Sequence, residues 1–598
     1  MNHSETFSRY LSELTYLRRM GQHFAKRHPK VAARLQLAPN DCADPHVERL
    51  LEGFALLSSR LQDRIDSGYT HIAESFLEVL YPQWVVPVPA MSVAKFDFLD
   101  PDLVLTSAYH LPRHTPLAAE SSRGLRCRFR TAADLDLWPI DVVSATFVAP
   151  DHLDLPRVPS GVATVLKLTL EATASTLDEM DVANLRFYVD GDRATVPALL
   201  DALFGGVRGL ALIPDGDPAR ARMLGPAHLK PWGLDDAHAL LPYPETARPG
   251  FRLLQEYFHF PQKFRFFEID GLSGHGAVGR LDLAILLTEH PNELTIDRHT
   301  FRLGAVPIIN LFPMASDPIR IDDTQLEYPL LPDACARRTT EIYRIQHVSD
   351  APADPTSGTI PPYYGYRHFS ADDDHPCFWK ARRRTSFQDD IPGTDMMLSL
   401  VDAHGGTTRP NTRLIFAHML CTNRGLAAEL PSGAMLQLEC ASPLAQAHLL
   451  VKPTLPVDPV RHQAALWQLV ANLSLDHLAL DGPAGLAALQ ETLFLFAPRD
   501  NADAARQIRG LRGLKCRPQF HHLNSQDRRG FCRGLEITLT VDDSSFSGSG
   551  FYRLGAVLDR FFATQTTINS FTRLIIQREG RQGVWWHWPP RCGDLALA

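Results

Sequence analysis

The chain has 598 residues, and its 60 Lys and Arg against 68 Asp and Glu give a net charge of −8. This mildly acidic balance argues against a dedicated nucleic-acid-binding protein, which usually carries a basic surplus. The 45 prolines, about 7.5% of the chain against a usual ~5%, disfavour a long helical bundle and favour short strands joined by turns.

Targeting and redox signals indicate a cytoplasmic protein. Residues Met1–Phe7 contain neither a basic region nor an apolar run, so no secretory signal is predicted. No segment approaches the ~18 uncharged apolar residues that span a bilayer. The nine cysteines lie between Cys42 and Cys592 without a CxxC pair, which indicates reduced thiols and no disulfide framework.

The first ~85 residues are predicted to be helical, because apolar residues recur there at helical spacing. In the first helix they form one stripe: Phe7, Tyr10, Leu11, Leu14, Leu17 and Phe24. The interface candidates within it are Phe7, Tyr10, Leu14 and Leu17. His28-Pro29 should end this helix, since proline lacks a backbone donor and restricts the residue before it.

A second helix is predicted to begin at Asp44-Pro45, because aspartate caps free amides and proline suits the first helical position. One face of this helix is apolar: Val47, Leu50, Leu51, Phe54, Leu57, Leu61 and Ile65. We expect Gly68 to stop it and a third short helix to cover 71–80. These short helices lack a local surface that could cover their stripes. The first stripe is therefore a candidate partner interface, and the equal alternative is that it packs inside its own domain beneath Val47–Ile65.

From about residue 91 the apolar period changes to two, which predicts strands. Leu166, Leu168 and Leu170 alternate with polar residues, and so do Leu535, Ile537 and Leu539 near the C-terminus. The expected fold class is α+β with mostly antiparallel sheets. We expect a helical region over 1–90, β-rich domains over 91–350, an irregular connection over 351–395 and a C-terminal α+β domain over 396–598.

Enzymatic signatures are missing from the sequence, which has no Walker A, HExxH or GxSxG motif. Gly548-Ser549-Gly550 precedes a predicted helix as a phosphate loop would, but a turn is the better interpretation. Cys421 lacks a partner base, because His418 should face the other side of the same strand. Asp372–His375 fits a solvated acidic loop better than a cation site. We therefore expect no catalytic residue, metal or cofactor.

An aromatic cluster near the C-terminus contains Trp585, Trp586 and Trp588. Neighbouring indoles expose a large apolar area unless something covers them. They could belong to the core or anchor an interface, since Trp is enriched at binding hot spots. We take Trp585 and Trp586 as candidate interface residues, together with the N-terminal stripe.

Several blocks of the sequence, in order and spread over nearly the whole chain, resemble the TssF family of type VI secretion system baseplate wedge subunits. They are Glu13–Ala32, Asp44–Ala55, Leu80–Pro82, Cys127–Pro139, Gly250–Phe264, Pro307–Phe312, Cys421–Arg424, Arg533–Glu536, Asn569–Thr572 and Trp588–Arg591. The most distinctive are Gln255–Phe258 and Cys421–Arg424. Residues 350–395 and 497–530 carry little of the resemblance.

The resemblance implies a structural protein and no enzyme. It implies that two TssF copies pair with one TssG, that this wedge carries TssK, and that wedges surround the VgrG spike beneath TssE and the sheath. It further implies a place at the cytoplasmic face of the inner membrane, with only indirect membrane contact. No nucleic acid and no small-molecule substrate are expected as partners.

Two other functions remain open on the residues alone. A carbohydrate-active β-rich hydrolase needs only two facing carboxylates and no sequence motif. A β-rich glycan-binding protein would also fit the many predicted strands. A polar cleft with paired carboxylates would favour the hydrolase, whereas exposed apolar patches would favour a scaffold.

Overall fold

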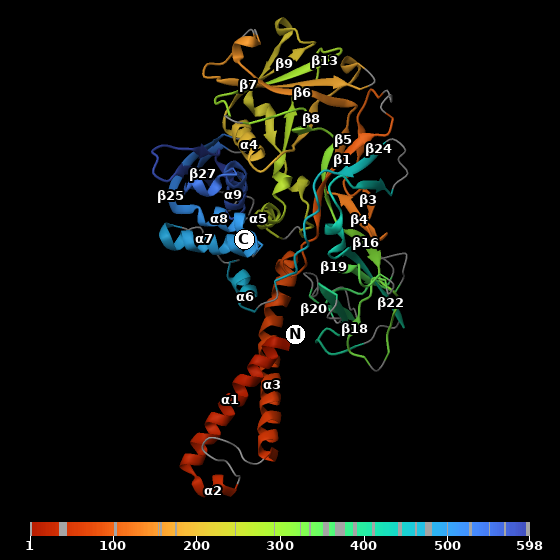
Figure 1. Cartoon of the computed structure of the whole chain (residues 1–598), viewed down its shortest axis with the longest axis vertical. Helices are drawn as coiled ribbons and strands as arrows, with labels where there is room; N and C mark the ends of the chain where they lie inside the picture. Colours follow the sequence, from red (N-terminus) through yellow and green to blue (C-terminus); the bar gives the residue numbers. More distant parts are fainter. Residues whose placement is uncertain are drawn as a thin grey trace.

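A long helical hairpin projects from a body built mainly of strands in the computed structural model of the chain (Figure 1). The structure describes residues 3–593 apart from 35–44, 101–104, 154, 156–157, 174–175, 245–246, 292–293, 323–324, 334–335, 351–357, 365–376, 387–390, 409–412, 440–444, 461–462, 473–480, 499, 525–528, 549 and 567–569. The predicted α+β class is confirmed, because helices frame the chain and most strand pairs between them are antiparallel.

The hairpin, which we call the stalk, consists of α1 (His3–Arg27), α2 (Pro29–Arg34) and α3 (Pro45–Leu80). As predicted, α1 ends just before His28-Pro29. The predicted stop at Gly68 is wrong, because α3 runs unbroken for 36 residues, a length of about 54 Å. A glycine inside a helix costs only ~1 kcal/mol, which a helix of this length tolerates.

The stalk is rooted in the body by the last turns of α3. Ala73 and Leu77 are fully buried there, in one apolar core with Trp84 of the short 3-10 helix η1 (Pro82–Trp84). None of the helices in the described part of the chain has both the length and the apolar character that a membrane crossing requires.

A closed six-stranded barrel lies beside the root of the stalk. Its strands, in order around the barrel, are β1 (Met91–Phe98), β15 (Ala305–Ile309), β4 (Arg126–Thr131), β3 (Pro116–Glu120), β23 (Met435–Leu438) and β24 (Ala445–Leu449). A separate ribbon pairs β2 (Tyr109–Leu111) with β5 (Leu135–Leu137). The predicted boundary at residue 396 stays a prediction, but strand pairing crosses it, since β23 and β24 close the barrel that β1 begins.

Two sheets face each other above the barrel. One contains β10 (Arg222–Leu224), β9 (Val207–Pro214), β13 (Arg280–Leu287), β7 (Thr164–Ala172) and β6 (Ile140–Val148); the other contains β11 (Leu229–Pro231), β12 (Phe266–Asp270), β8 (Asn184–Val189) and β14 (Phe301–Arg302). The predicted alternation at Leu166–Leu170 is confirmed in β7, whose leucines meet β8 residues and α4 (Thr195–Gly205) in one core.

A smaller unit lies below the barrel, beside the stalk (Figure 1). Its strands are β16 (Phe312–Ala315), β17 (Ile319–Arg320), β18 (Tyr328–Pro329), β19 (Glu341–Ser349), β20 (Phe378–Thr385), β21 (Thr394–Val401) and β22 (Leu414–Thr422). Within the segment expected to be irregular, 378–385 is therefore a strand. Its run of three arginines hid the periodicity, although Arg383 donates inward to the carbonyls of Ile342 and Tyr343.

The C-terminal unit is a sheet of β25 (Leu511–Asn524), β26 (Arg529–Val541), β27 (Phe571–Arg578), β28 (Trp586–His587) and β29 (Arg591–Cys592). Its helices are α6 (Gln463–Asn472), α7 (Gly482–Phe496), α8 (Ala502–Arg509) and α9 (Tyr552–Thr564), joined by α5 (Pro249–His259) from the middle of the chain. The pair β26–β27 is parallel, and α9 supplies the crossover that such a pair requires.

Candidate assembly interface

The two long stalk helices pack against each other through small residues. Ala55 and Ser59 of α3 are fully buried, and Leu14 of α1 is only 5% exposed. Polar contacts flank this seam, because Glu13 accepts a hydrogen bond from Ser58 at 3.4 Å and Arg18 pairs with Glu48. The internal contact of the stalk is thus narrow, and its two long helices spread apart toward α2 (Figure 1).

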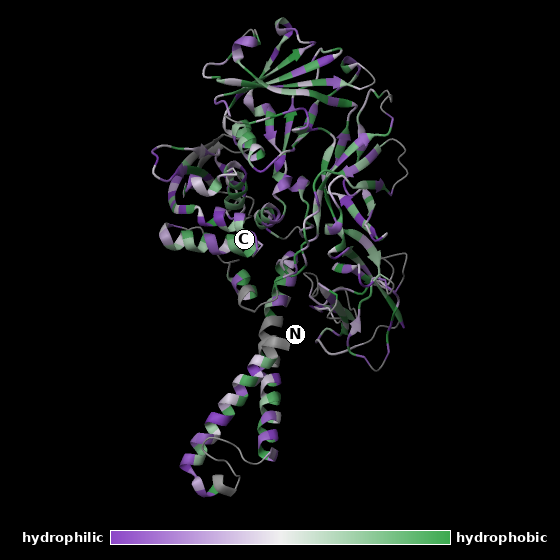
Figure 2. Cartoon of the chain, in the orientation of Figure 1, coloured by the Kyte–Doolittle hydropathy of each residue, from purple (hydrophilic) through white to green (hydrophobic). Residues whose placement is uncertain are grey.

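The large apolar side chains of the stalk lie mostly outside that contact. Those at least 40% exposed are Phe7, Leu11, Tyr16, Met20 and Phe24 on α1 and Leu50, Phe54, Leu56, Leu57, Leu61, Ile65, Ile72, Phe76 and Leu80 on α3. Figure 2 shows apolar residues recurring along both helices. A soluble helix pair normally buries such residues, so this surface has the composition of a protein contact.

The spacing on α3 indicates what kind of partner would fit. Leu50, Phe54, Leu57 and Leu61 follow one another at intervals of four, three and four residues. This is the a/d pattern by which one helix receives the side chains of another. Leu50 is 73% exposed and Leu61 is 62% exposed, so this seam is open in the isolated chain. The stalk can therefore accept further helices.

The structure divides the predicted N-terminal stripe between two faces. Phe7 is 60% exposed and lies 6.2 Å from Tyr10 between ring centroids, whereas Leu14 faces into the hairpin. Tyr10 and Leu17 are partly buried. The sequence reasoning missed Tyr16 and Met20, although apolar residues on every side of a helix are themselves a sign of burial by a partner.

Trp585 and Trp586 lie at the joint between the C-terminal sheet and α4. A side chain at Gly205 would collide with the Trp586 ring, which also lies 5.2 Å from the Tyr552 ring. The guanidinium of Arg578 lies 4.1 Å from the ring centre of Trp585. Both indoles are partly buried by these internal contacts. A role of Trp585 and Trp586 in binding a partner stays a prediction.

The glycine loop before α9 is filled by a carboxylate of the chain itself. Asp201 of α4 accepts hydrogen bonds from the amides of Phe551 at 3.3 Å and Tyr552 at 3.1 Å. Gly548 and Gly550 both have positive φ, as the turn interpretation requires. The place where a phosphate would bind a helix N-terminus is thus taken by Asp201. Burial raises the pKa of this carboxyl to about 6.

The remaining candidate chemical groups fit structural roles. Cys421 is fully buried, and burial raises the pKa of its thiol to about 12, which disfavours a nucleophilic thiolate. His418 contacts the Ser349 hydroxyl at 3.1 Å. Asp372–His375 lies outside the described residues. Across the described ranges, no three His, Cys, Asp or Glu side chains gather closely enough to hold a metal ion.

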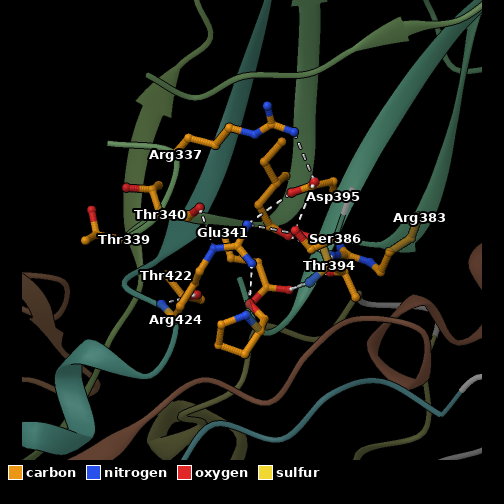
Figure 3. A network of polar contacts seen from close by, with 12 residues as sticks. Arg337, Thr339, Thr340, Glu341, Arg383, Ser386, Thr394, Asp395, Thr422 and Arg424 are labelled. Carbon is orange, nitrogen blue, oxygen red and sulfur yellow. Dashed lines mark hydrogen bonds and ion pairs between the residues drawn. The ribbon is translucent and has the colours of Figure 1, made fainter. Parts of the chain in front are cut away.

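The distinctive block Cys421–Arg424 ties the barrel to the unit below it, and Figure 3 shows the contacts of Arg424 on the side of that unit. Arg424 is buried and donates to the carbonyls of Thr340 at 3.0 Å and Pro392 at 2.6 Å, and to Asp395 at 3.1 Å. The backbone amide of Asn423 donates a hydrogen bond to Oδ1 of Asn310 at 2.7 Å. The adjoining cavity of about 10 Å³ has room for little more than a water molecule. This block therefore positions units and does not form a substrate site.

The other distinctive block, Gln255–Phe258, also lies inside the molecule. Glu256 of α5 is fully buried and accepts hydrogen bonds from the amides of Leu240 at 2.8 Å and Leu241 at 3.0 Å. Its second oxygen pairs with the buried ammonium of Lys263. The carboxylate therefore satisfies loop amides and one cation at once, which makes α5 a joint between the sheets and the C-terminal unit.

Comparison with known proteins identifies the family. The family model described as "Type VI secretion system, TssF" matches residues 2–595. The chain belongs to the TssF family. TssF1 of Pseudomonas aeruginosa, a type VI secretion system component, is 32% identical to it, and the match covers 98% of each chain. The resemblance drawn from the sequence is thus confirmed.

Solved structures share the fold. A chain of a TssK-TssF-TssG baseplate subcomplex has a TM-score of 0.72 and 23% identity, covering 92% of this chain and 99% of that one. A chain of a type VI secretion system baseplate complex has a TM-score of 0.60 and 23% identity, covering 99% and 100%. These relatives are named as secretion-system components and not as enzymes.

Proposed function

We propose that this TssF-family protein is a structural wedge subunit of a type VI secretion system baseplate, held in the assembly by its stalk. The observation that carries the proposal is that the stalk buries the small residues Ala55 and Ser59. It exposes large apolar residues such as Leu57 and Leu61. A subunit that joins a helical bundle presents an open heptad seam of this kind.

The occupant that we propose for the stalk seam is a TssG-like protein. Support comes from the solved relative of the same fold, which belongs to a subcomplex named for TssK, TssF and TssG. We extend the proposal to TssK and a second TssF copy as wedge partners, and to TssE, the sheath and the VgrG spike as neighbours of the wedge. The proposed location is the cytoplasmic face of the inner membrane.

Substitutions on the two faces of the stalk test this function. Phe54→Ser, Leu57→Ser and Leu61→Ser together should keep the melting temperature of the body and weaken binding of the TssG-like genomic neighbour at least ~10-fold. Leu14→Asp should instead loosen the hairpin, because it places a charge in an apolar contact. Co-purification and hydrogen exchange along α1 and α3 measure these two effects.

The matched control removes apolar groups of similar exposure from the body. Leu326, Leu455 and Met435 are 68%, 75% and 58% exposed, so Leu326→Ser, Leu455→Ser and Met435→Ser together replace three exposed apolar side chains outside α1 and α3. This control should retain the TssG-like partner. Equal binding by the triple stalk variant and the control would refute the stalk as the interface.

A further inference from the structure

A partly buried group of basic side chains lies where the barrel meets the smaller unit below it (Figure 1). Alternate residues of β4 share one face, so Arg126, Arg128 and Arg130 point away from the barrel core, which contains Cys127 and Phe129. Arg130 stands at the end of this row. We call Arg130 and the basic side chains around it the arginine site: Arg113, His114, Arg130 and Arg344.

Arg130 lacks the acidic partner that its two neighbours on β4 possess. Arg126 lies 3.0 Å and Arg128 3.9 Å from a carboxylate oxygen of Glu439. Within the described ranges no carboxylate pairs with Arg130, and its Nε atom is buried without a hydrogen-bond partner. Leaving a buried, charged donor unpaired destabilises a protein, so an acceptor is missing at this position.

Several side chains around Arg130 are themselves basic. The turn before β3 lies against the end of β4, because the amide of His114 donates to the carbonyl of Thr131 at 3.0 Å. Burial, together with the charges of Arg113 and Arg344, lowers the pKa of the Arg130 guanidinium to about 10. Partial burial and the charges of Arg130 and Arg113 likewise lower the pKa of His114. Like charges are thus gathered here, and a bound anion would relieve their repulsion.

The carboxylates of the chain near this site are already engaged. Asp134 and Glu256 both lie near Arg113. Asp134 accepts a hydrogen bond from the backbone amide of Arg113 at 2.7 Å, and Glu256 is held by two loop amides and a buried lysine. Among the residues that the structure describes, neither carboxylate pairs with Arg130 or Arg344. The acceptor that this site lacks must therefore come from another molecule.

The backbone that carries Arg344 is fixed on both sides of the joint. Tyr343 of β19 packs in the core of the barrel, whereas Ile342 and Ile345 of the same strand pack in the core of the smaller unit. A guanidinium group on such a rigid element loses little freedom when it binds an oxyanion, which it can contact through two parallel N–H donors.

We propose that the arginine site binds a carboxylate of a different protein subunit in the assembled wedge. The proposal rests on the proposed function as an assembly subunit and adds a polar contact outside the stalk. Arg113, Arg130 and Arg344 are only partly buried and His114 is exposed, so an acidic side chain on the surface of a partner can reach them. The two arginines without an ion pair can each donate two hydrogen bonds to it, and neutral His114 can donate one.

The test uses the full chain assembled with its TssG-like and TssK-like neighbours. Arg130→Lys places an amine in the site, and zero-length carbodiimide coupling joins an amine to a carboxylate in contact with it. Arg126→Lys is the positive control, because Glu439 of the same chain lies 3.0 Å from Arg126. Arg320→Lys, at an exposed position outside the arginine site, is the negative control. Mass spectrometry of the digested complex identifies the coupled pairs.

We expect the amine at position 130 to couple to an Asp or Glu of the TssG-like or TssK-like protein. The amine at position 126 should couple to Glu439, and that at position 320 to neither of the other subunits. Arg130→Gln with Arg344→Gln should weaken binding of the coupled subunit at least ~10-fold at about 50 mM NaCl. Arg126→Gln with Arg320→Gln, which changes the net charge equally, should weaken it less than ~2-fold.

Coupling of position 130 only to carboxylates of the same chain would overturn the proposal, and so would equal binding by the two double variants. Inorganic phosphate at ~20 mM probes a free anion as the alternative source. If phosphate raises the melting temperature of wild type but not of Arg130→Gln with Arg344→Gln, and no other subunit couples, the site binds a free anion and the proposal is wrong. Loss of the TssG-like protein from the stalk triple variant is measured independently, so failure here is distinguishable from failure of the proposed function.

Discussion

Individual buried charges in this protein lie at joints between units. Glu256 binds loop amides and Lys263, Arg424 binds backbone carbonyls, and Asp201 binds the first amides of α9. Each charged group is satisfied by the protein itself, and each fixes the position of one unit on another. Such groups hold the units in a fixed relative position. Removing one partner destabilises the protein, because it leaves the other buried group without a hydrogen bond.

The first prediction concerns the pH dependence of the Asp201 joint. Burial raises the pKa of Asp201 to about 6 from an ordinary value of 3.8, so the native state binds its proton more tightly than the unfolded state does. The stabilising contribution of this carboxyl is therefore largest below pH 3.8 and is lost as the pH rises through about 6. Asp201→Asn has no such titration.

Melting temperatures of wild type and Asp201→Asn between about pH 4 and 7 measure the effect. The stability of wild type relative to the variant should decrease as the pH rises over this range. A constant difference between the two proteins would contradict an elevated pKa at this joint.

The second prediction concerns Arg424. Arg424→Lys keeps the positive charge but cannot reach the carbonyls of Thr340 and Pro392 and the carboxylate of Asp395 together. We expect a loss of about 2–4 kcal/mol in the free energy of unfolding, because buried acceptors lose charged donors. Arg320→Lys, at an exposed position, should change it by less than ~0.5 kcal/mol. Denaturant unfolding compares the two, and equal stabilities would contradict the role of Arg424.

At the scale of elements, sequence patterns predicted the helix ends and strands that depend on neighbouring residues along the chain. Proline placed the end of α1 at Arg27, and alternation identified the strand that became β26. The continuity of α3 through Gly68 was missed, because the sequence signal for a helix stop is a single weak preference. The two faces of α1 could not be separated from periodicity alone, since nothing in the stripe says that Leu14 is buried in the hairpin while Phe7 stays exposed.

The third prediction concerns the crossing of α5 and α9. At Gly250 an added methyl group would collide with Thr564 and lie 3.0 Å from the Cα atom of Phe561, which cannot move without moving the helix. Gly250→Ala should therefore destabilise the C-terminal unit by about 1–3 kcal/mol. At Gly53 of α3, an added methyl group would have no other atom within 4 Å. Gly53→Ala should therefore raise the free energy of unfolding by about 0.5–1 kcal/mol.

Thermal and denaturant unfolding of both glycine variants measure this difference. The signs of the two effects should be opposite, although the substitutions are chemically identical. A neutral Gly250→Ala would mean that α5 and α9 can separate, and that their close approach does not hold the C-terminal unit to the sheets.

At the scale of the whole molecule, the order of units along the chain differs from their order in space. Barrel strands come from three distant segments, as the pairing of β1 with both β15 and β24 shows. No local pattern in Met91–Phe98 specifies either partner strand, so the barrel could not be predicted from the sequence. Family membership could be predicted, because it rests on many sequence blocks in the same order along the chain and not on any one contact.

The last prediction follows from the stalk of the isolated chain. Interfaces of obligate complexes bury more than ~2,000 Å², and the exposed side chains of α1 and α3 form a surface that only partners can cover. The chain alone should therefore self-associate, and light scattering during size-exclusion chromatography should detect it. Phe54→Ser, Leu57→Ser and Leu61→Ser together should reduce this association. Apolar contact persists at high salt, so this self-association should survive at about 500 mM NaCl. A wild-type chain that stays monomeric in isolation would contradict the open seam as an assembly surface.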